Sequence, residues 1–153
     1  MPSSDDGPSE VIGAFLKSAT ELVAAYVRPY GTKTYAHLRI LVPSAEEEGA
    51  WVHTKKGIGI QVDQVPALRD GVRRLLDVAA PNKVVATLPA GKDQIRVLTK
   101  TFKGEQYLDV RRFFSDKNDE WQPTQKGVTV HAERLSDLVD LVDQLEKGAE
   151  SFS

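Results

Sequence analysis

Positively charged and aromatic side chains alternate along the chain between residues 94 and 114. The residues concerned are Arg96, Lys100, Phe102, Lys103, Tyr107, Arg111, Phe113 and Phe114. Lysine and arginine can contact phosphate groups, and aromatic rings can stack on unpaired bases, which contributes roughly 1–3 kcal/mol per base. This mixture of side chains would suit the binding of a single nucleic-acid strand with little dependence on its base sequence.

No other group of residues has the spacing of a catalytic or metal site. The three histidines, His37, His53 and His131, have no metal-ligand spacing. The chain has no cysteine, which excludes thiolate ligands, cysteine nucleophiles and disulfides. No serine or threonine has a recognisable base partner. We therefore expect a protein that is not an enzyme and that uses no cofactor or metal ion.

The charged residues are distributed unevenly. The formal net charge is −2, but residues 83–127 hold nine Lys and Arg against six Asp and Glu, while residues 131–147 hold two against five. Local patches of this kind steer ligands more than the net charge does. Residues 1–9 lack the basic and apolar parts of a signal peptide, so we expect a disordered tail there and an intracellular protein, in the cytoplasm, nucleoid or nucleus. No apolar run has the length of a membrane-spanning helix, and no membrane partner is expected.

The sequence contains an internal repeat of about 70 residues. Residues 51–60 match residues 121–130, with a tryptophan, a threonine and a Lys-Gly pair at the same places. The offset of 70 continues into the segment after residue 130 and back to the pair Leu38/Leu108. We expect it to become 73 before Gly31 and Gly104, because a turn can absorb a change in length. The chain is therefore predicted to contain two units of one architecture.

Each unit has the pattern of four strands followed by a helix. In the second unit, segments 83–88, 94–102, 106–114 and 121–130 carry β-branched and aromatic residues and are separated by short turns, which favours antiparallel hairpins. Apolar residues then follow at helical spacing between Leu135 and Leu145, and Gly148 is expected to cap the helix.

The predicted fold class is α+β, with two tandem four-stranded antiparallel sheet-plus-helix units (ββββα twice). We place the units at residues 10–80 and 81–148, after the tail at 1–9. The link at residues 79–82 is too short for the units to separate far. We therefore expect them to pack as one domain, as an intramolecular pseudo-dimer with a shared core.

Part of the second unit resembles the C-terminal domain of the positive-cofactor-four transcriptional coactivator family. The resemblance rests on Phe102-Lys103-Gly104, on residues 108–114 and 123–130, and on the leucine-spaced helix. It implies a curved four-stranded sheet with a helix, and two copies that form a dimer binding single-stranded or melted DNA. The tandem repeat would supply both copies in one chain. The family's binding positions correspond to Phe102, Lys103, Arg111, Phe114 and Lys126.

The alternation of side chains along strands independently predicts a nucleic-acid-binding face on the second unit. Aliphatic residues of the second unit, such as Ile95 and Val110, fall on the face that the helix covers, and the charged and aromatic residues fall on the open face. Alternation places Arg96, Lys100, Phe102, Tyr107, Arg111 and Phe113 on the open face. With Lys103, Phe114 and Lys126, which the resemblance implies, these are the predicted nucleic-acid-binding residues. Additional candidates are Lys33, Lys55, Lys56 and Trp121. The alternative is structural, because strand aromatics often pack in cores and edge lysines often prevent aggregation.

These observations favour sequence-tolerant binding of single-stranded DNA in transcription or genome maintenance. Two alternatives remain open from the residues. The same fold could be a protein–protein interaction module with an acidic partner, or it could bind single-stranded RNA, which uses the same contacts and differs at the 2′-hydroxyl.

The first unit has apolar residues on both faces of two neighbouring strands in this alignment. The outward residues are expected to be Val23, Ala25, Val27 and Leu41. An exposed apolar patch usually marks an interaction site. The sequence therefore predicts either a homodimer through the first unit or an intramolecular cover over this face.

Overall fold

The computed structural model describes residues 11–78 and 80–151. It contains two four-stranded antiparallel sheets, each followed by a helix, which confirms the predicted fold class. The predicted tail at 1–9 lies outside the described residues. The first sheet has the order β1 (Val11–Ser18), β2 (Glu21–Tyr30), β3 (Lys33–Pro43), β4 (Trp51–Gln61), and leads through a 3-10 turn (Val62–Gln64) into α1 (Val65–Arg74) and a second 3-10 turn (Leu75–Asp77). The second has the order β5 (Val84–Ala90), β6 (Asp93–Phe102), β7 (Glu105–Ser115), β8 (Trp121–His131), and leads through a 3-10 turn (Ala132–Arg134) into α2 (Leu135–Glu150).

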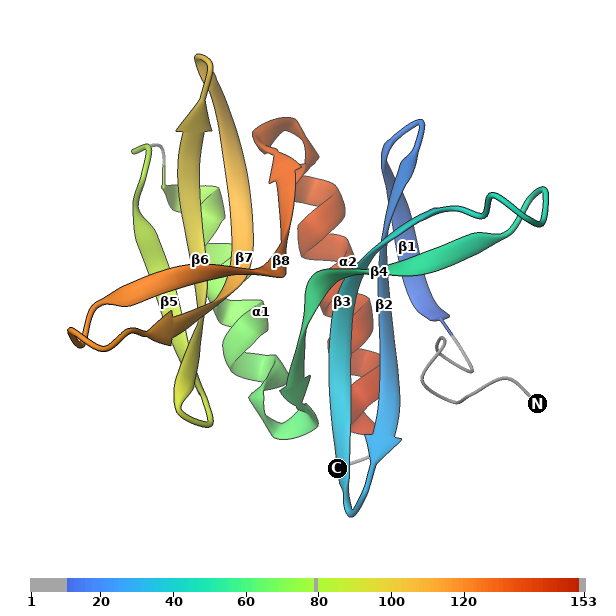
Figure 1. Cartoon of the computed structure of the whole chain (residues 1–153), viewed down its shortest axis with the longest axis horizontal. Coiled ribbons are helices and arrows are strands. Elements are labelled where there is room, and N and C mark those ends of the chain that lie inside the picture. Colours follow the sequence, from blue (N-terminus) through green and yellow to red (C-terminus); the bar gives the residue numbers. More distant parts are fainter. Residues whose placement is uncertain (1–10, 79, 152–153) are drawn as a thin grey trace.

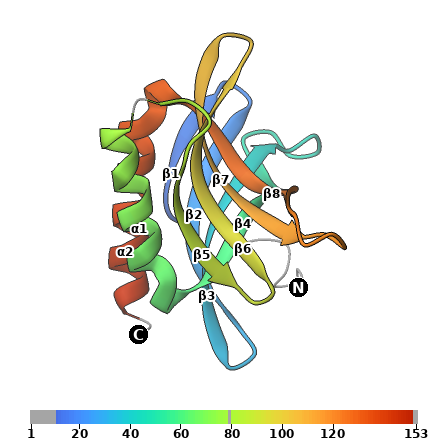
Figure 2. The ribbon, with the colours of Figure 1, turned by 90° about the vertical axis from the view of Figure 1, so that its left-hand side faces the viewer.

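The two sheets lie beside each other (Figure 1), and the two helices form one layer on one side of both sheets (Figure 2). The hairpin of β2 and β3 points one way along the molecule and the hairpin of β6 and β7 points the opposite way (Figure 1). The last strands of the two sheets, β4 and β8, meet at the centre. This arrangement has a pseudo-twofold axis between β4 and β8, as expected for a pseudo-dimer within one chain.

Each helix covers the sheet of the other unit. Helix α1 packs on β5 and β6, and α2 packs on β1 and β2. Close packing requires glycine at two of these crossings. A Cβ at Gly71 of α1 would lie 2.7 Å from the Ala86 Cβ, and a Cβ at Gly148 of α2 would collide with the Ile12 side chain. Gly148 therefore permits the close approach of α2 to β1, and the prediction that it ends the helix was wrong, since α2 continues to Glu150.

One continuous core lies between the helix layer and the two sheets. The second sheet contributes Ile95, Val97, Leu108 and Val110, which are all at most 3% exposed. Leu138, Val142 and Leu145 of α2 and Leu68 and Val72 of α1 complete it from the other side. The inward and outward faces of β6 and β7 are those that the alternation predicts. No helix in the described ranges is long and apolar enough to span a membrane.

Strand pairing corrects the alignment of the two units. Leu38 lies opposite Ile58, and Val110 lies opposite Val128. Because Ile58 and Val128 occupy the same position of the repeat, Leu38 corresponds to Val110 and not to Leu108. The turns after β2 and β6 have the same length, so the change in length does not fall at the turn glycines. It falls in the longer β3–β4 loop, which has two residues more than the β7–β8 loop (residues 44–50 against 116–120).

The offset between β2 and β6 is therefore 72 rather than the expected 73, because Tyr30 and Phe102 stand at the same turn. A slip of one residue moves every side chain of a strand to the other face. Val23, Ala25 and Val27, which were expected to point outward, lie in the core and are 0%, 0% and 9% exposed. Leu41 does lie on the open side, but it is only 5% exposed. The predicted assembly surface was wrong, and a homodimer through it has no basis.

Candidate nucleic-acid interface

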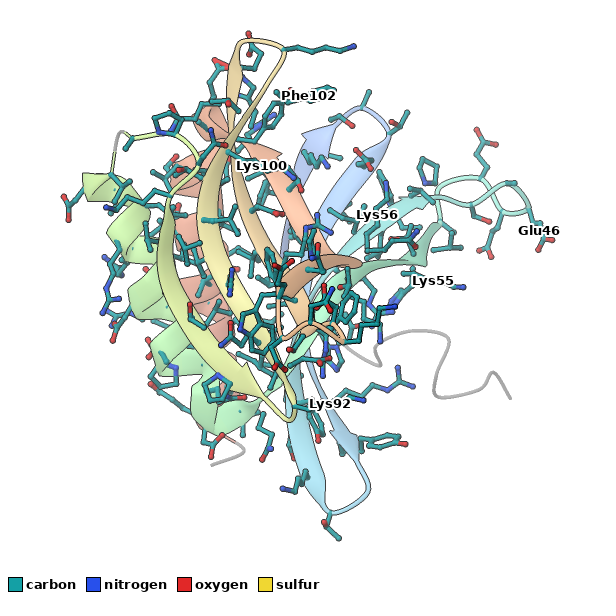
Figure 3. The ribbon with its side chains drawn as sticks, turned by 60° about the vertical axis from the view of Figure 1, so that its left-hand side comes forward. Glu46, Lys55, Lys56, Lys92, Lys100 and Phe102 are labelled. Atoms are coloured by element: carbon teal, nitrogen blue, oxygen red, sulfur yellow. The ribbon has the colours of Figure 1, made fainter. Side chains whose placement is uncertain are left out.

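The open face of the second sheet carries most of the predicted binding residues. Register places Lys100 beside Tyr107, Arg96 beside Arg111, and Phe113 beside Gln94. Figure 3 shows Lys100 and Phe102 towards the tip of the β6–β7 hairpin, and Lys55 and Lys56 on β4 of the other unit. Strand alternation thus brings side chains that are separated in sequence onto one surface.

Asp109 lies at the centre of this face and is 2% exposed. Arg111 donates to it from Nε (2.9 Å to Oδ2) and from Nη2 (3.1 Å to Oδ1), and the Thr129 hydroxyl donates to Oδ1 (2.8 Å). The Lys100 Nζ lies 3.7 Å from Oδ2. Arg111 also donates to the Thr124 carbonyl (2.7 Å). Two of the expected phosphate-binding cations therefore share one buried carboxylate.

Arg96 is also engaged within the sheet. Its guanidinium lies 4.7 Å from the Phe113 ring centroid and 5.7 Å from that of Trp121, and its Nε donates to the Gln94 side chain (3.1 Å). Cation–π pairs of this geometry stabilise a surface and keep the cation accessible. Phe113 and Trp121 are half-buried, so part of each ring packs within the protein and part remains available to a ligand.

Two aromatic side chains at the ends of β6 and β7 are exposed. Phe102 is 60% exposed, Phe114 is 40% exposed, and the Lys103 Nζ lies 5.3 Å from the Phe102 ring centroid. Tyr107 makes an edge contact with His131, at 5.4 Å between ring centroids. An exposed ring next to an exposed ammonium group can stack on a base and contact the adjacent phosphate.

The open face of the first sheet carries polar and aromatic residues that sequence reasoning missed. The one-residue slip placed apolar side chains here, whereas the structure places Tyr26, Arg28, Tyr35, His37 and Arg39 on this face. The Tyr26 and His37 rings are stacked, with centroids 4.7 Å apart and an interplanar angle of 11°. With the offset of 72, Tyr26 and His37 align with Leu98 and Asp109, which pair across β6 and β7. The corrected alignment therefore places the tyrosine and the histidine side by side on the open face.

A pocket of about 600 Å³ opens on this first face. Tyr26, Tyr30, Tyr35 and His37 supply its rings, and its cationic residues are Arg28, Arg39, Lys55, Arg112 and Lys126. Arg112 and Lys126 come from the second unit, so both units build the pocket. Lys126, predicted to act on the second unit's own face, thus reaches the first. Arg112 also donates to Asp93 (2.8 Å).

The remaining candidates lie apart from one another. Lys33 is exposed at the start of β3, and Lys56 is exposed on β4 but does not line the pocket. His131, at the end of β8, accepts from the Glu133 backbone N–H at Nδ1 (3.1 Å) and contacts the Glu105 carboxylate through Nε2. Within residues 11–78 and 80–151, no cluster of three or more His, Asp or Glu residues could hold a metal ion.

The histidines of the first face are held neutral. Burial, together with the nearby Arg39 and Arg28 guanidinium groups, lowers the pKa of His37 to about 4. Burial and the same arginines lower the pKa of His53, and burial raises the pKa of the Tyr26 hydroxyl. The positive charge of the first face at neutral pH therefore comes from its arginines and lysines.

The protein is expected to lose stability as the pH falls from 7 to 5. The unfolded chain protonates His37 near the ordinary histidine pKa of 6.5, while the folded protein resists protonation down to a pKa of about 4. The stabilising contribution is therefore complete above pH 6.5 and is lost progressively below it. Discounted for the partial exposure of the ring, the free energy of unfolding should fall by about 1–2 kcal/mol between about pH 7 and pH 5. Urea unfolding at several pH values measures this, and a His37→Gln variant with the same pH dependence as the wild type would contradict it.

The second unit matches a known family. Residues 91–141 match the sequence model of the family described as Transcriptional Coactivator p15 (PC4). This confirms the resemblance to the positive-cofactor-four family, and the two sheet-and-helix units support the tandem arrangement in part. A comparison with curated proteins finds no match.

Solved structures of PC4 homologues are similar to parts of the chain. One is the orthorhombic crystal form of the homologue from Burkholderia pseudomallei K96243, with 23% identity, coverage of 41% of this chain and 86% of that chain, and a TM-score of 0.36. Another is the bacteriophage T5 homologue of the eukaryotic coactivator PC4, implicated in recombination-dependent DNA replication. It has 24% identity, coverage of 48% of this chain and 97% of that chain, and a TM-score of 0.36.

Proposed function

We propose that the protein binds single-stranded DNA, with little dependence on base sequence, and acts without catalysis in transcription or genome maintenance inside the cell. The observation that carries this proposal is the open face of the second sheet, where cations alternate with aromatic rings. Phe102 and Lys103 at its tip are the clearest pair, because both are exposed and adjacent. The match of residues 91–141 to a transcriptional coactivator family supports the same function.

The proposed roles divide the binding residues into two groups. Phe102, Tyr107, Phe113 and Phe114 provide rings for stacking, with Trp121 at the edge of this set. The cations Arg96, Lys100, Lys103, Arg111 and Lys126 contact phosphates, together with Lys33, Lys55 and Lys56 of the first unit. Stacking is available to every base, and phosphate contacts carry no sequence information. Such a surface therefore prefers unpaired strands without selecting their sequence.

The protein is expected to bind oligo-dT more tightly than a duplex of equal length, and binding should weaken with salt. Each phosphate contact on a single strand contributes about −0.7 to the slope of log K against log salt concentration, so five contacts would give about −3.5. Because Lys100 and Arg111 already share Asp109, we expect these five cations to give a slope nearer to about −2. Fluorescence anisotropy with labelled oligo-dT, the duplex and oligo-U over a salt series measures both quantities. Binding that does not depend on salt would contradict the mechanism, and tighter binding of oligo-U would identify RNA as the ligand.

A further inference from the structure

The open faces of the two sheets differ in their charged residues, and this difference predicts different affinities for a single strand. We infer that the pocket on the first sheet is the principal binding site for a phosphate-bearing nucleotide of a bound single strand, and that the second face is the weaker of the two. This inference rests on the proposed function and specifies where in the molecule its affinity lies. The corresponding positions of the two sheets, related by the corrected offset, show why.

The central arginine has a different neighbour in each sheet. Arg39 and Arg111 correspond, since each lies opposite a glycine of the last strand and donates to a threonine carbonyl, at 3.4 Å and 2.7 Å. In the second sheet, Arg111 is paired with Asp109. The residue corresponding to Asp109 is His37, which is neutral at physiological pH. Asp109 therefore neutralises the charge of Arg111, whereas the neutral His37 leaves the charge of Arg39 available to a ligand.

The replacement of the carboxylate is accommodated by the adjacent strand. Thr129 donates to Asp109 in the second sheet, and the corresponding residue beside His37 is Gly59. A Cβ at Gly59 would lie 2.9 Å from the His37 ring, so only glycine leaves room for the imidazole. The first face thus differs from the second at two matched positions, because His37 with Gly59 replaces Asp109 with Thr129.

The pocket is lined by cations, and two of the residues that line it carry buried hydrogen-bonding atoms without a partner in the described part of the chain. Among the described residues that line it, none has a carboxylate side chain. His37 Nδ1 and Arg39 Nε, and His53 Nε2 close by, are buried without a hydrogen-bond partner within the described part of the chain. A buried polar atom left in this state costs folding free energy, and a ligand that accepts its hydrogen bond offsets this cost. The Arg39 N–H and the N–H of a neutral imidazole are donors suited to a phosphate oxygen.

The size and the rings of the pocket suit a nucleotide rather than a simple anion. Its volume of about 600 Å³ lies within the usual range of small-molecule sites, about 300–1,000 Å³. Tyr30 is 76% exposed at one end, next to Tyr35, with 6.3 Å between the ring centroids. A base can stack on these rings while Arg39, Arg28 and Lys126 contact the phosphates on either side. Because Lys126 belongs to the second unit, the site is complete only when both units are packed together.

The test compares matched variants of the two sheets for binding to oligo-dT at one salt concentration. Arg39→Gln should weaken binding by about tenfold or more, as expected for a lost charge-assisted contact. Arg111→Gln should weaken it less, because Asp109 already balances that charge. His37→Asp, which recreates in the first sheet the carboxylate of the second, should weaken binding to a similar extent as Arg39→Gln and make the salt slope shallower by about 0.7. Circular dichroism and thermal unfolding establish that each variant is folded.

A second measurement needs no variant. Titration of the wild type with a short oligo-dT, followed by NMR of the histidine side chains, should shift the His37 and His53 signals before that of His131 in the second unit. If the wild type binds oligo-dT but Arg39→Gln and His37→Asp bind it equally well, or if His131 responds first, the inference is wrong and the proposed function stands. If the wild type does not bind oligo-dT at all, the proposed function itself fails.

Discussion

The second unit, residues 81–151, is expected not to fold as a monomer when it is separated from the first. In the intact chain α2 lies on β1 and β2, and the second sheet is covered by α1. The separated fragment would therefore expose two apolar surfaces that contain Ile95, Val97, Leu138 and Leu145, each at most 1% exposed in the whole protein. Exposure of four such side chains costs about 6–12 kcal/mol, at roughly 1.5–3 kcal/mol each. This is comparable with the total stability of a typical domain, about 5–15 kcal/mol.

Circular dichroism and light scattering of the fragment provide the measurement. We expect either an unfolded chain or a dimer in which two copies exchange helices, and we expect the addition of the first unit, residues 10–80, to restore a folded one-to-one complex. A fragment that is folded and monomeric would show that each unit is independent. The proposal that residues 10–80 and 81–148 form one domain would then be withdrawn.

The faces of the second sheet could be predicted because its strands alternate clearly. Arg96 and Lys100 flank Val97 and Thr99, so a period of two separates charged from buried positions without any knowledge of the partner strand. The turns of this unit carry strong signals as well, and the predicted strand limits differ from the observed ones by at most two residues. Local pattern was sufficient where one face is polar and the other is apolar.

The same reasoning failed on β2, where it had nothing to distinguish the faces. Five consecutive residues, from Val23 to Val27, are buried, including Tyr26. Because the pattern does not alternate, the assignment of β2 side chains to the two faces depended on the repeat alignment. An error of one residue in that alignment assigned every side chain to the wrong face. The polar first face with Tyr26 and Arg28 was lost from the prediction for this reason.

The exchange of helices is not encoded in any local pattern. The apolar stripes of α1 and α2 predict that each helix is buried on one side, and they do not say which sheet covers it. Arg69 and Arg73 on α1 pair with Asp143 and Glu146 on α2, at 2.6–3.5 Å, and these contacts join the two units across the helix layer. Such pairs are recognisable only when the arrangement of the helices is known.

Replacement of Asp109 by asparagine is expected to destabilise the protein and to strengthen its second binding face. The substitution keeps the size of the side chain but removes the charge that holds Arg111 and Lys100. Loss of charge-assisted hydrogen bonds at this 2% exposed position should lower the free energy of unfolding by about 1–3 kcal/mol. The same change releases two cations towards solvent, because Arg111 and Lys100 have side chains that are 16% and 38% exposed. If both then contact phosphates, the salt slope for oligo-dT should become steeper by up to about 1.4.

Urea unfolding and the anisotropy titration measure the two effects on the same samples, with Asp140→Asn as the control. Asp140 is an exposed residue of α2, so its replacement changes the net charge equally but on the helix layer. If the control steepens the slope as much as Asp109→Asn does, the effect belongs to net charge and not to the open face. If Asp109→Asn lowers stability but leaves the slope unchanged, Arg111 and Lys100 are structural and do not contact DNA. An increase from one bound strand to two in the variant would indicate that Asp109 is what keeps the second face weaker than the first.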